Sequence, residues 1–185
     1  AGNGSGADLH RDAFAIRLRQ SLGHPLAVDA WEFRALQDDC ATPTMRSAFV
    51  ARIAELAPET LWISIGANDY ARASWSAAEF GAAYGAMLDA LMAAIPALDI
   101  QCLSPIARVD ESANALGHPL SDYRAEIEAV CATRGFATYH DGTSVVSLGN
   151  LADGVSPDAA GHLEIANFLA NPTPDIAPVS ALGSA

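Results

Sequence analysis

The stretch LWISIGANDY, residues 61–70, joins a run of β-branched and aromatic residues to a glycine and two polar side chains. The apolar run predicts a strand over residues 60–65 that ends at Gly66. A glycine lets the chain turn sharply off the strand, and Asn68 can then direct its amide N–H groups at a ligand oxygen. The alternative interpretation is an Asx-type turn, in which Asn68 and Asp69 satisfy only nearby backbone groups.

Segments typical of helices and strands alternate on both sides of this stretch. Strands are predicted at 25–33, 60–65, 99–103 and 136–139, and helices at 8–22, 44–56, 74–95, 121–134 and 158–170. The predicted N-caps include Thr42 or Thr44 for the second helix and Ser74 or Ser76 for the third. Strands separated by long helices predict right-handed βαβ units, and therefore an α/β fold with helices on both faces of a parallel sheet. Functional residues in such sheets gather at the carboxyl ends of the strands.

The length and net charge of the sequence limit the classes of protein to which it can belong. The chain has 185 residues, the size of one domain, and we expect a single domain over 1–170 followed by a Pro-, Ala- and Ser-rich tail over 171–185. The net charge of −12 argues against a nucleic-acid partner and against anionic membrane surfaces. No apolar run predicts a membrane span and no signal peptide is recognised, which fits a cytoplasmic protein or a secreted one whose signal has been removed.

The sequence predicts no cofactor and no metal. Cys40, Cys102 and Cys131 are widely spaced and form no CxxC pair, so we expect reduced thiols rather than a disulfide framework or a zinc site. No P-loop is present, and the glycines of residues 2–6 do not follow a predicted strand, as a nucleotide-binding turn would.

A second group of polar residues precedes the last predicted helix. Asp153 is followed by Ser156 and Pro157, and His162 lies within the helix. A carboxylate at this place suits a side chain that orients a catalytic base. The alternative is ordinary helix capping by Ser156, with Pro157 in the first turn and His162 as a structural residue.

Together the two groups resemble conserved blocks of the SGNH, or GDSL-type, hydrolases. Residues 61–70 look like the third block, a hydrophobic strand followed by Gly-x-Asn-Asp, and residues 153–169 (DGVSPDAAGHLEIANFL) look like the fifth block. The resemblance covers about residues 8–170. It implies a flavodoxin-like three-layer α/β/α sandwich of the SGNH-hydrolase type. It also implies a serine nucleophile that attacks an ester carbonyl, a His base oriented by an Asp, and an oxyanion hole.

Two residues match the family's site directly. Asn68 matches the oxyanion asparagine, with Gly66 and Asp69 beside it in the same block, and Asp153 matches the carboxylate that orients the base. The family has Asp-x-x-His, whereas this chain has Ser156 at the base position, and a hydroxyl is no proton acceptor near neutral pH. A substitute base would have to be His162, His140 or His10, none at the family's spacing.

The first and second blocks are irregular. Ser5, in Asn3-Gly4-Ser5, is the best match to the nucleophile, although no strand precedes it; an alternative alignment puts Gly4 there, and a flexible terminus is a third interpretation. With no strand before Ser5, we expect a sheet of about four strands, or residues that precede Ala1 in a longer protein. Residues 33–45 contain no glycine to match the second block's oxyanion donor.

Three hypotheses remain at this point. The first is an active SGNH-like serine hydrolase or acyltransferase acting on an ester, thioester or acetyl group of a small molecule. The second is a catalytically degenerate relative that binds an acyl or sugar ligand, performs a non-hydrolytic step, or acts as a partner subunit. The third is a different α/β enzyme whose turn at residues 66–69 imitates the motif. The sequence leaves the substrate and the oligomeric state open.

Overall fold

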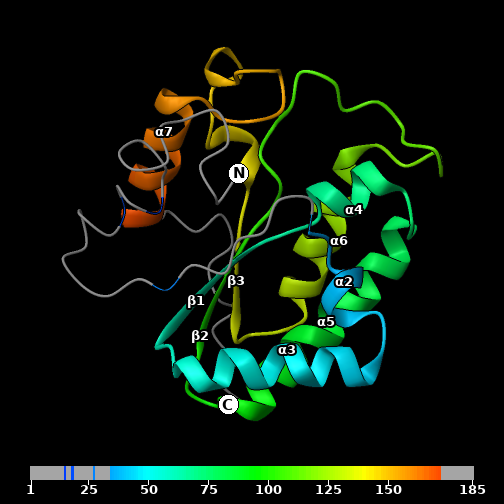
Figure 1. The fold of residues 1–185 in the computed structure, drawn as a ribbon, viewed down its shortest axis with the longest axis vertical. Helices are drawn as coiled ribbons and strands as arrows, with labels where there is room; N and C mark the ends of the chain where they lie inside the picture. The colour runs from blue at the N-terminus through cyan, green and yellow to red at the C-terminus, as the bar shows by residue number, and fades with distance from the viewer. Residues whose placement is uncertain (1–14, 16–17, 19–26, 28–33, 172–185) are drawn as a thin grey trace, which may run out of the picture.

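The computed structural model describes Ala15, Leu18, Ala27 and residues 34–171 (Figure 1). Most of the predicted helix at 8–22 and of the predicted strand at 25–33 lies outside these residues, as do the tail after Asn171 and the candidate nucleophile Ser5. The main elements in chain order are α2 (Gln37–Cys40), α3 (Pro43–Leu56), β1 (Thr60–Ser64), α4 (Ala67–Arg72), α5 (Ala77–Ala94), β2 (Asp99–Leu103), α6 (Leu120–Ala132), β3 (Ala137–His140) and α7 (Ala159–Ala170).

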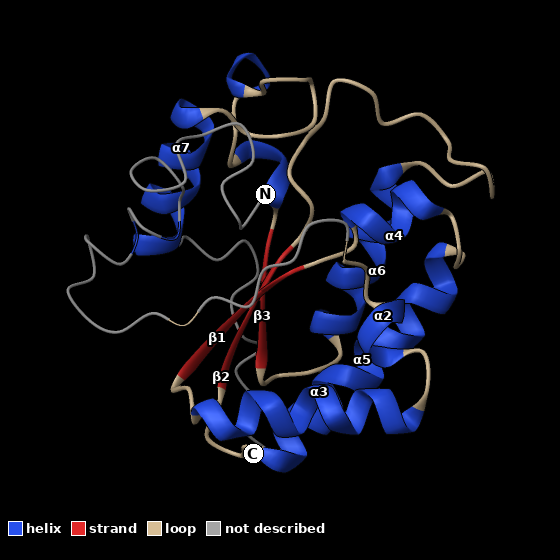
Figure 2. Cartoon of the chain, viewed as in Figure 1, coloured by secondary structure: helices blue, strands red, loops and turns tan. Residues whose placement is uncertain are grey.

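The strands form a parallel sheet in the order β1-β2-β3 (Figure 2). Ile63 of β1 lies opposite Cys102 of β2, which in turn lies opposite Tyr139 of β3. Each strand is joined to the next through helices, because parallel neighbours require a crossover connection. The predicted α/β fold with a parallel sheet is therefore confirmed.

The two faces of the sheet bury different hydrophobic clusters. Ile63, Ile100 and Tyr139 belong to the larger cluster, which packs against α3, α5 and α6. Trp62 and Leu103 belong to the smaller cluster, which packs against α7 and the segment after β3. Successive side chains of a strand point to opposite faces, so this alternation gives three layers: helices, sheet and helices, with α7 across the sheet from α3, α5 and α6 (Figure 1).

The helix caps confirm two of the predicted start signals and correct a third. Thr42 caps α3 by accepting from Met45 N, and Ser76 caps α5 in a reciprocal capping box with Glu79. The last helix begins at Ala159, one residue later than predicted, because Asp158 caps α7 and its carboxylate accepts from Ala160 N and Gly161 N. The interpretation of Ser156 as the cap, with Pro157 in the first turn, was therefore wrong.

All three cysteines lie among the described residues. Cys40, Cys102 and Cys131 are free and buried, as expected for reduced thiols. No helix among the described residues is long and apolar enough to cross a membrane.

Candidate functional site at the carboxyl ends of the strands

Gly66 turns the chain from β1 into α4. Its φ is +114°, a conformation that side chains other than glycine rarely adopt. A Cβ at this position would lie 3.1 Å from the Phe80 ring, so the turn is also packed closely against α5. Gly66 O accepts from Tyr70 N at 2.9 Å and so begins α4, which carries Asn68 in its first turn.

The amide of Asn68 is held in a fixed orientation. Its Nδ2 donates to Arg34 O at 2.8 Å. A carboxamide nitrogen carries two N–H groups, so this bond uses one of them and orients the other. An amide held in this way is what a preorganised oxyanion donor requires, because it needs no rearrangement when the negative charge develops.

Asp69 lies inside the protein and not on its surface. Its side chain is only 2% exposed, and both carboxylate oxygens accept from Leu36 N at 3.0 Å. Burial raises the pKa of this carboxyl, and the backbone N–H groups of Leu36 and Gln37 act in the opposite direction. The contacts show Asp69 fixing the backbone of residues 34–36 to α4; a role in binding substrate stays a prediction.

Residues 34–36 occupy the place at which the second block is expected. Arg34 O receives the Asn68 amide, while Ala35 N donates to Asp38 and Leu36 N donates to Asp69. Sequence reasoning could not find this segment, because it contains no glycine. The signal that could have indicated it is indirect: Asp69 is a buried carboxylate that needs donors from another part of the chain.

Asp153 lies exposed in the loop before α7. Its Oδ1 accepts from Val155 N at 2.9 Å and from Ser156 N at 2.6 Å, and its Oδ2 accepts from Ser156 Oγ at 3.2 Å. The backbone N–H groups of Ser156 and Val155 lower the pKa of Asp153, so the carboxylate is ionised at neutral pH. Ser156 therefore contacts the carboxylate that the sequence predicts to orient a catalytic base.

Two of the three proposed substitute bases lie in the interior. His162 is 0% exposed and His140 is 1% exposed. The His140 ring packs against Trp62 and Phe168, and its Nε2 lies 2.7 Å from Gln101 Oε1. A general base must touch the proton that it removes, so the burial of both rings argues against these two roles. His10 lies outside the described residues.

A more accessible histidine was missed by sequence reasoning. His118 is half-buried, and its Nδ1 lies 3.0 Å from Asp122 Oδ2. Its backbone N–H donates to Asn114, whose own amide donates to Tyr70 O, and its ring contacts that of Tyr123. These contacts place His118 over α6 and the end of α4. The i,i+4 spacing of His118 and Asp122 was its sequence signal.

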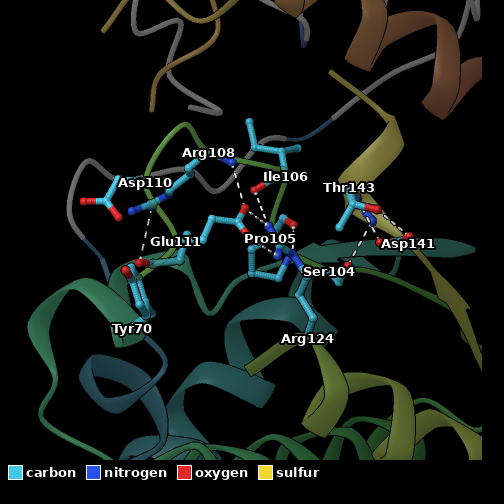
Figure 3. A network of polar contacts seen from close by, with 12 residues as sticks. Tyr70, Ser104, Pro105, Ile106, Arg108, Asp110, Glu111, Arg124, Asp141 and Thr143 are labelled. Carbon is cyan, nitrogen blue, oxygen red and sulfur yellow. Dashed lines mark hydrogen bonds and ion pairs between the residues drawn. The ribbon is translucent and has the colours of Figure 1, made fainter. Parts of the chain in front are cut away.

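An internal ion pair holds the loop that follows β2 (Figure 3). Arg124 of α6 donates to both carboxylate oxygens of Glu111, at 2.7 and 2.6 Å, and to the backbone oxygens of Pro105 and Ile106, at 2.7 and 2.9 Å. Glu111 Oε1 also accepts from Arg108 N at 2.8 Å. These five bonds fix the path of residues 105–111, so the position of Arg108 is determined by the fold.

This loop joins the two candidate blocks at one edge of the sheet. Arg108 Nη2 donates to Ala67 O at 3.4 Å, next to Asn68, and Val109 N donates to Gly154 O at 3.0 Å, next to Asp153. The turn after β1 and the loop before α7 are therefore connected through residues 108–109. Sequence reasoning did not single out Arg108, although its place after the carboxyl end of β2 was a usable signal.

Comparison with known proteins identifies the architecture. No family model matches the sequence, and no curated protein matches it significantly. Solved structures do match. A protein described as lipolytic and of the G-D-S-L family from Desulfitobacterium hafniense aligns over 88% of this chain and 89% of its own, with a TM-score of 0.68 and 15% identity. The chain has the SGNH-hydrolase fold.

Two further structural neighbours are described by an activity. An acetyl esterase variant with an acetate ion aligns over 89% of this chain and 91% of its own, with a TM-score of 0.61 and 14% identity. A salicylyl-acyltransferase from a tetracycline biosynthetic pathway aligns over 88% of this chain and 48% of its own, with a TM-score of 0.66 and 16% identity. At these identities the likeness establishes the fold, while the activity and the substrate have to be argued from the site.

Proposed function

We propose that this chain is a serine hydrolase or acyltransferase of the SGNH type that acts on an ester, thioester or acetyl group of a small molecule. In this proposal Ser5 attacks the carbonyl carbon, and Asn68 donates to the oxygen that becomes negatively charged. The bond between the acyl carbon and its oxygen or sulfur then breaks, the alcohol or thiol leaves with the proton of the Ser5 hydroxyl, and the acyl group stays on Ser5. Water or an acceptor hydroxyl attacks this acyl-serine ester, takes the acyl group and returns a proton to the Ser5 oxygen, as in serine acyl transfer reactions.

The orientation of the Asn68 amide is the observation that carries this proposal. Its bond to Arg34 O supports a role as oxyanion donor, since the bond would hold the second N–H in a fixed orientation. The connection of residues 108–109 to both Ala67 and Gly154 supports a single site that includes the Asp153 loop. The activities named for the structural neighbours, esterase and acyltransferase, belong to the same reaction class.

Hydrolysis of 4-nitrophenyl acetate tests the proposal. We expect measurable turnover by the full chain, and a covalent adduct on Ser5 after treatment with a serine-directed phosphonate, located by mass spectrometry. Ser5→Ala is expected to abolish both, while Ser47→Ala, which changes an exposed serine of α3, leaves both unchanged. Absence of turnover and of any adduct would overturn the proposed function, and an adduct on another residue would overturn the role of Ser5.

A second candidate function is favoured by the contact between Ser156 and Asp153. The hydroxyl bonds the carboxylate at the position where the family has its histidine, as expected of a degenerate relative that binds an acyl or sugar ligand without hydrolysing it. Such a protein would lack turnover but retain the oriented Asn68.

Replacing Ser156 by histidine distinguishes an incomplete site from an unrelated one. An imidazole at this position would lie beside Asp153, whose carboxylate already bonds both the backbone N–H and the side chain of residue 156. We expect Ser156→His to raise kcat/KM for 4-nitrophenyl acetate by at least about tenfold, since general base catalysis contributes about 10²–10⁴-fold. Ser156→Ala is the matched control and should give no increase. If the histidine variant folds and its rate does not rise, Ser5 is not positioned as the nucleophile.

A further inference from the structure

Arg108 differs from most other described arginines in its surroundings. It is partly buried, yet it forms no ion pair with any described residue. The arginines that do pair with a carboxylate of the described chain are Arg34, Arg52, Arg72, Arg124 and Arg134. Among the described arginines, this combination of partial burial and no carboxylate partner is shared only by Arg46, in a chain with 22 acidic and 10 basic residues.

Glu111 and Asp153, the two carboxylates that act electrostatically on Arg108, are bonded to other groups, and Asp110 accepts from Ser112 N. Both oxygens of Glu111 are bonded to Arg124, and one of them also accepts from the backbone N–H of Arg108 itself. Asp153 is close enough to influence Arg108 electrostatically, but its oxygens bond Val155 and Ser156. The guanidinium side chain therefore keeps most of its donors for another partner, since an arginine carries five N–H groups.

The contacts that Arg108 does make orient it. Its Nη2 donates to Ala67 O at 3.4 Å, a long bond, and its guanidinium carbon lies 5.7 Å from the centre of the Tyr70 ring. Figure 3 shows the side chain extending toward Tyr70, away from the Arg124–Glu111 pair. Burial lowers the pKa of Arg108 relative to a free arginine, which means that its charge has lost hydration that an anion could replace.

We propose that Arg108 binds a carboxylate group of the substrate beside the reacting ester, and that the chain therefore prefers acyl substrates that carry such a group. This inference rests on the proposed function, because it assigns a substrate class to the same site. The ester lies at Asn68, one residue from the carbonyl oxygen that Arg108 contacts, and the carboxylate lies against the guanidinium.

A carboxylate fits this position better than a phosphate does. The planar fork of a guanidinium matches a carboxylate in a bidentate pair. A phosphate monoester carries nearly two negative charges, and the net charge of −12 together with Asp153 would repel it more strongly. One guanidinium balances one negative charge.

The test compares substrates that differ only in this charge. The first pair, mono-(4-nitrophenyl) glutarate and 4-nitrophenyl valerate, differs by a carboxylate on the acyl group. The second pair, 3-acetoxybenzoate and its methyl ester, differs by a carboxylate on the leaving group. We expect the wild-type chain to prefer the anionic member of at least one pair by about tenfold or more in kcat/KM. This is roughly the effect on kcat/KM of one hydrogen bond to a charged group. In Arg108→Gln that preference should disappear, mainly through KM, while the neutral esters change by less than about threefold.

Two further variants separate a local contact from a change in overall charge. Arg134→Gln removes one positive charge at the pair with Asp89 near the end of α6 and should keep the preference. Arg108→Lys should restore part of it, because it keeps the charge without the fork. The same preference in wild type and Arg108→Gln, or a stronger preference for 3-acetoxyphenyl phosphate than for 3-acetoxybenzoate, would overturn the inference.

A binding measurement keeps this inference separate from the proposed function. If the wild-type chain hydrolyses none of these esters, the proposed function fails, and calorimetric titration with glutarate then decides the inference alone. Saturable binding that is lost in Arg108→Gln and kept in Arg134→Gln would support it. No binding to wild type, or equal binding to both variants, would overturn it.

Discussion

Replacing Arg124 by alanine is expected to lower the free energy of unfolding by about 3 kcal/mol, the low end of the range for breaking a buried ion pair. The side chain of Arg124 is 8% exposed, and it is bonded to Glu111 and to two backbone oxygens. Its removal leaves these acceptors without their donor. The 30% exposure of the Glu111 side chain allows water to replace part of the loss, which is why the low end applies.

Chemical denaturation measures this effect, and a surface pair provides the control. Arg134→Ala removes a comparable bidentate contact with Asp89, whose side chain is 56% exposed, and should cost no more than about 1 kcal/mol. Equal losses in the two variants would contradict the importance assigned to the interior pair. Arg124→Ala should also lower kcat/KM for the anionic esters at temperatures where it stays folded, because residues 105–111 would lose the contacts that fix Arg108.

The pH dependence of stability gives a second measurement on the same pair. Arg124 holds the pKa of Glu111 below its usual range, chiefly through the hydrogen bonds between the two side chains. A lowered folded-state pKa stabilises the protein fully above the unfolded value of about 4.3, and this contribution is lost as the pH falls through the folded value. The difference in stability between wild type and Arg124→Ala should therefore shrink as the pH falls below about 4. A difference that does not depend on pH would mean that the ionised carboxylate is not the group stabilised.

The sheet and most helices could be predicted from the sequence because their signals are local. The run before Gly66 and the segment DIQCL each carry the composition of a buried strand, and β1 and β2 follow them closely. Thr42 with Pro43, and Ser76 with Glu79, are capping patterns complete within four residues. The same kind of local signal gave a wrong start for α7. Ser156 and Asp158 are both of residue types that cap helices, but Asp158 forms the cap, whereas Ser156 is bonded to Asp153.

The candidate site was only half predictable, because its other half depends on contacts between distant segments. Asn68 and Asp153 follow recognisable patterns, whereas the partner of Asn68 is a backbone oxygen 34 positions earlier. The role of Arg124 likewise depends on Glu111, 13 positions away across an irregular loop. Periodicity carries no information about such pairs. The burial of His140 and His162 could not be predicted from the sequence either, because a histidine on an amphipathic helix or at a strand end can be buried or exposed.

If the proposed function holds, replacing Asn68 by alanine is expected to lower kcat for ester hydrolysis by about 10²–10³-fold, as the loss of one oxyanion donor does in acyl-transfer enzymes. KM should change little, because the contact strengthens only when the carbonyl oxygen becomes an oxyanion. The variant also loses the bond to Arg34 O, which should cost about 1 kcal/mol of stability. Steady-state kinetics and thermal denaturation on the same preparation measure the two effects separately.

Asn114→Ala is the matched control for the structural part of this loss. The amide of Asn114 also supports backbone near α4, since it donates to Tyr70 O and to the Tyr123 hydroxyl and accepts from two N–H groups of its own turn. Its removal should cost at least as much stability as that of Asn68, while kcat stays within about threefold. If both variants lose stability and kcat in parallel, Asn68 acts only through the fold. If Asn68→Ala alone loses kcat, the second N–H of its amide is the oxyanion donor, and the bond to Arg34 is what keeps it oriented.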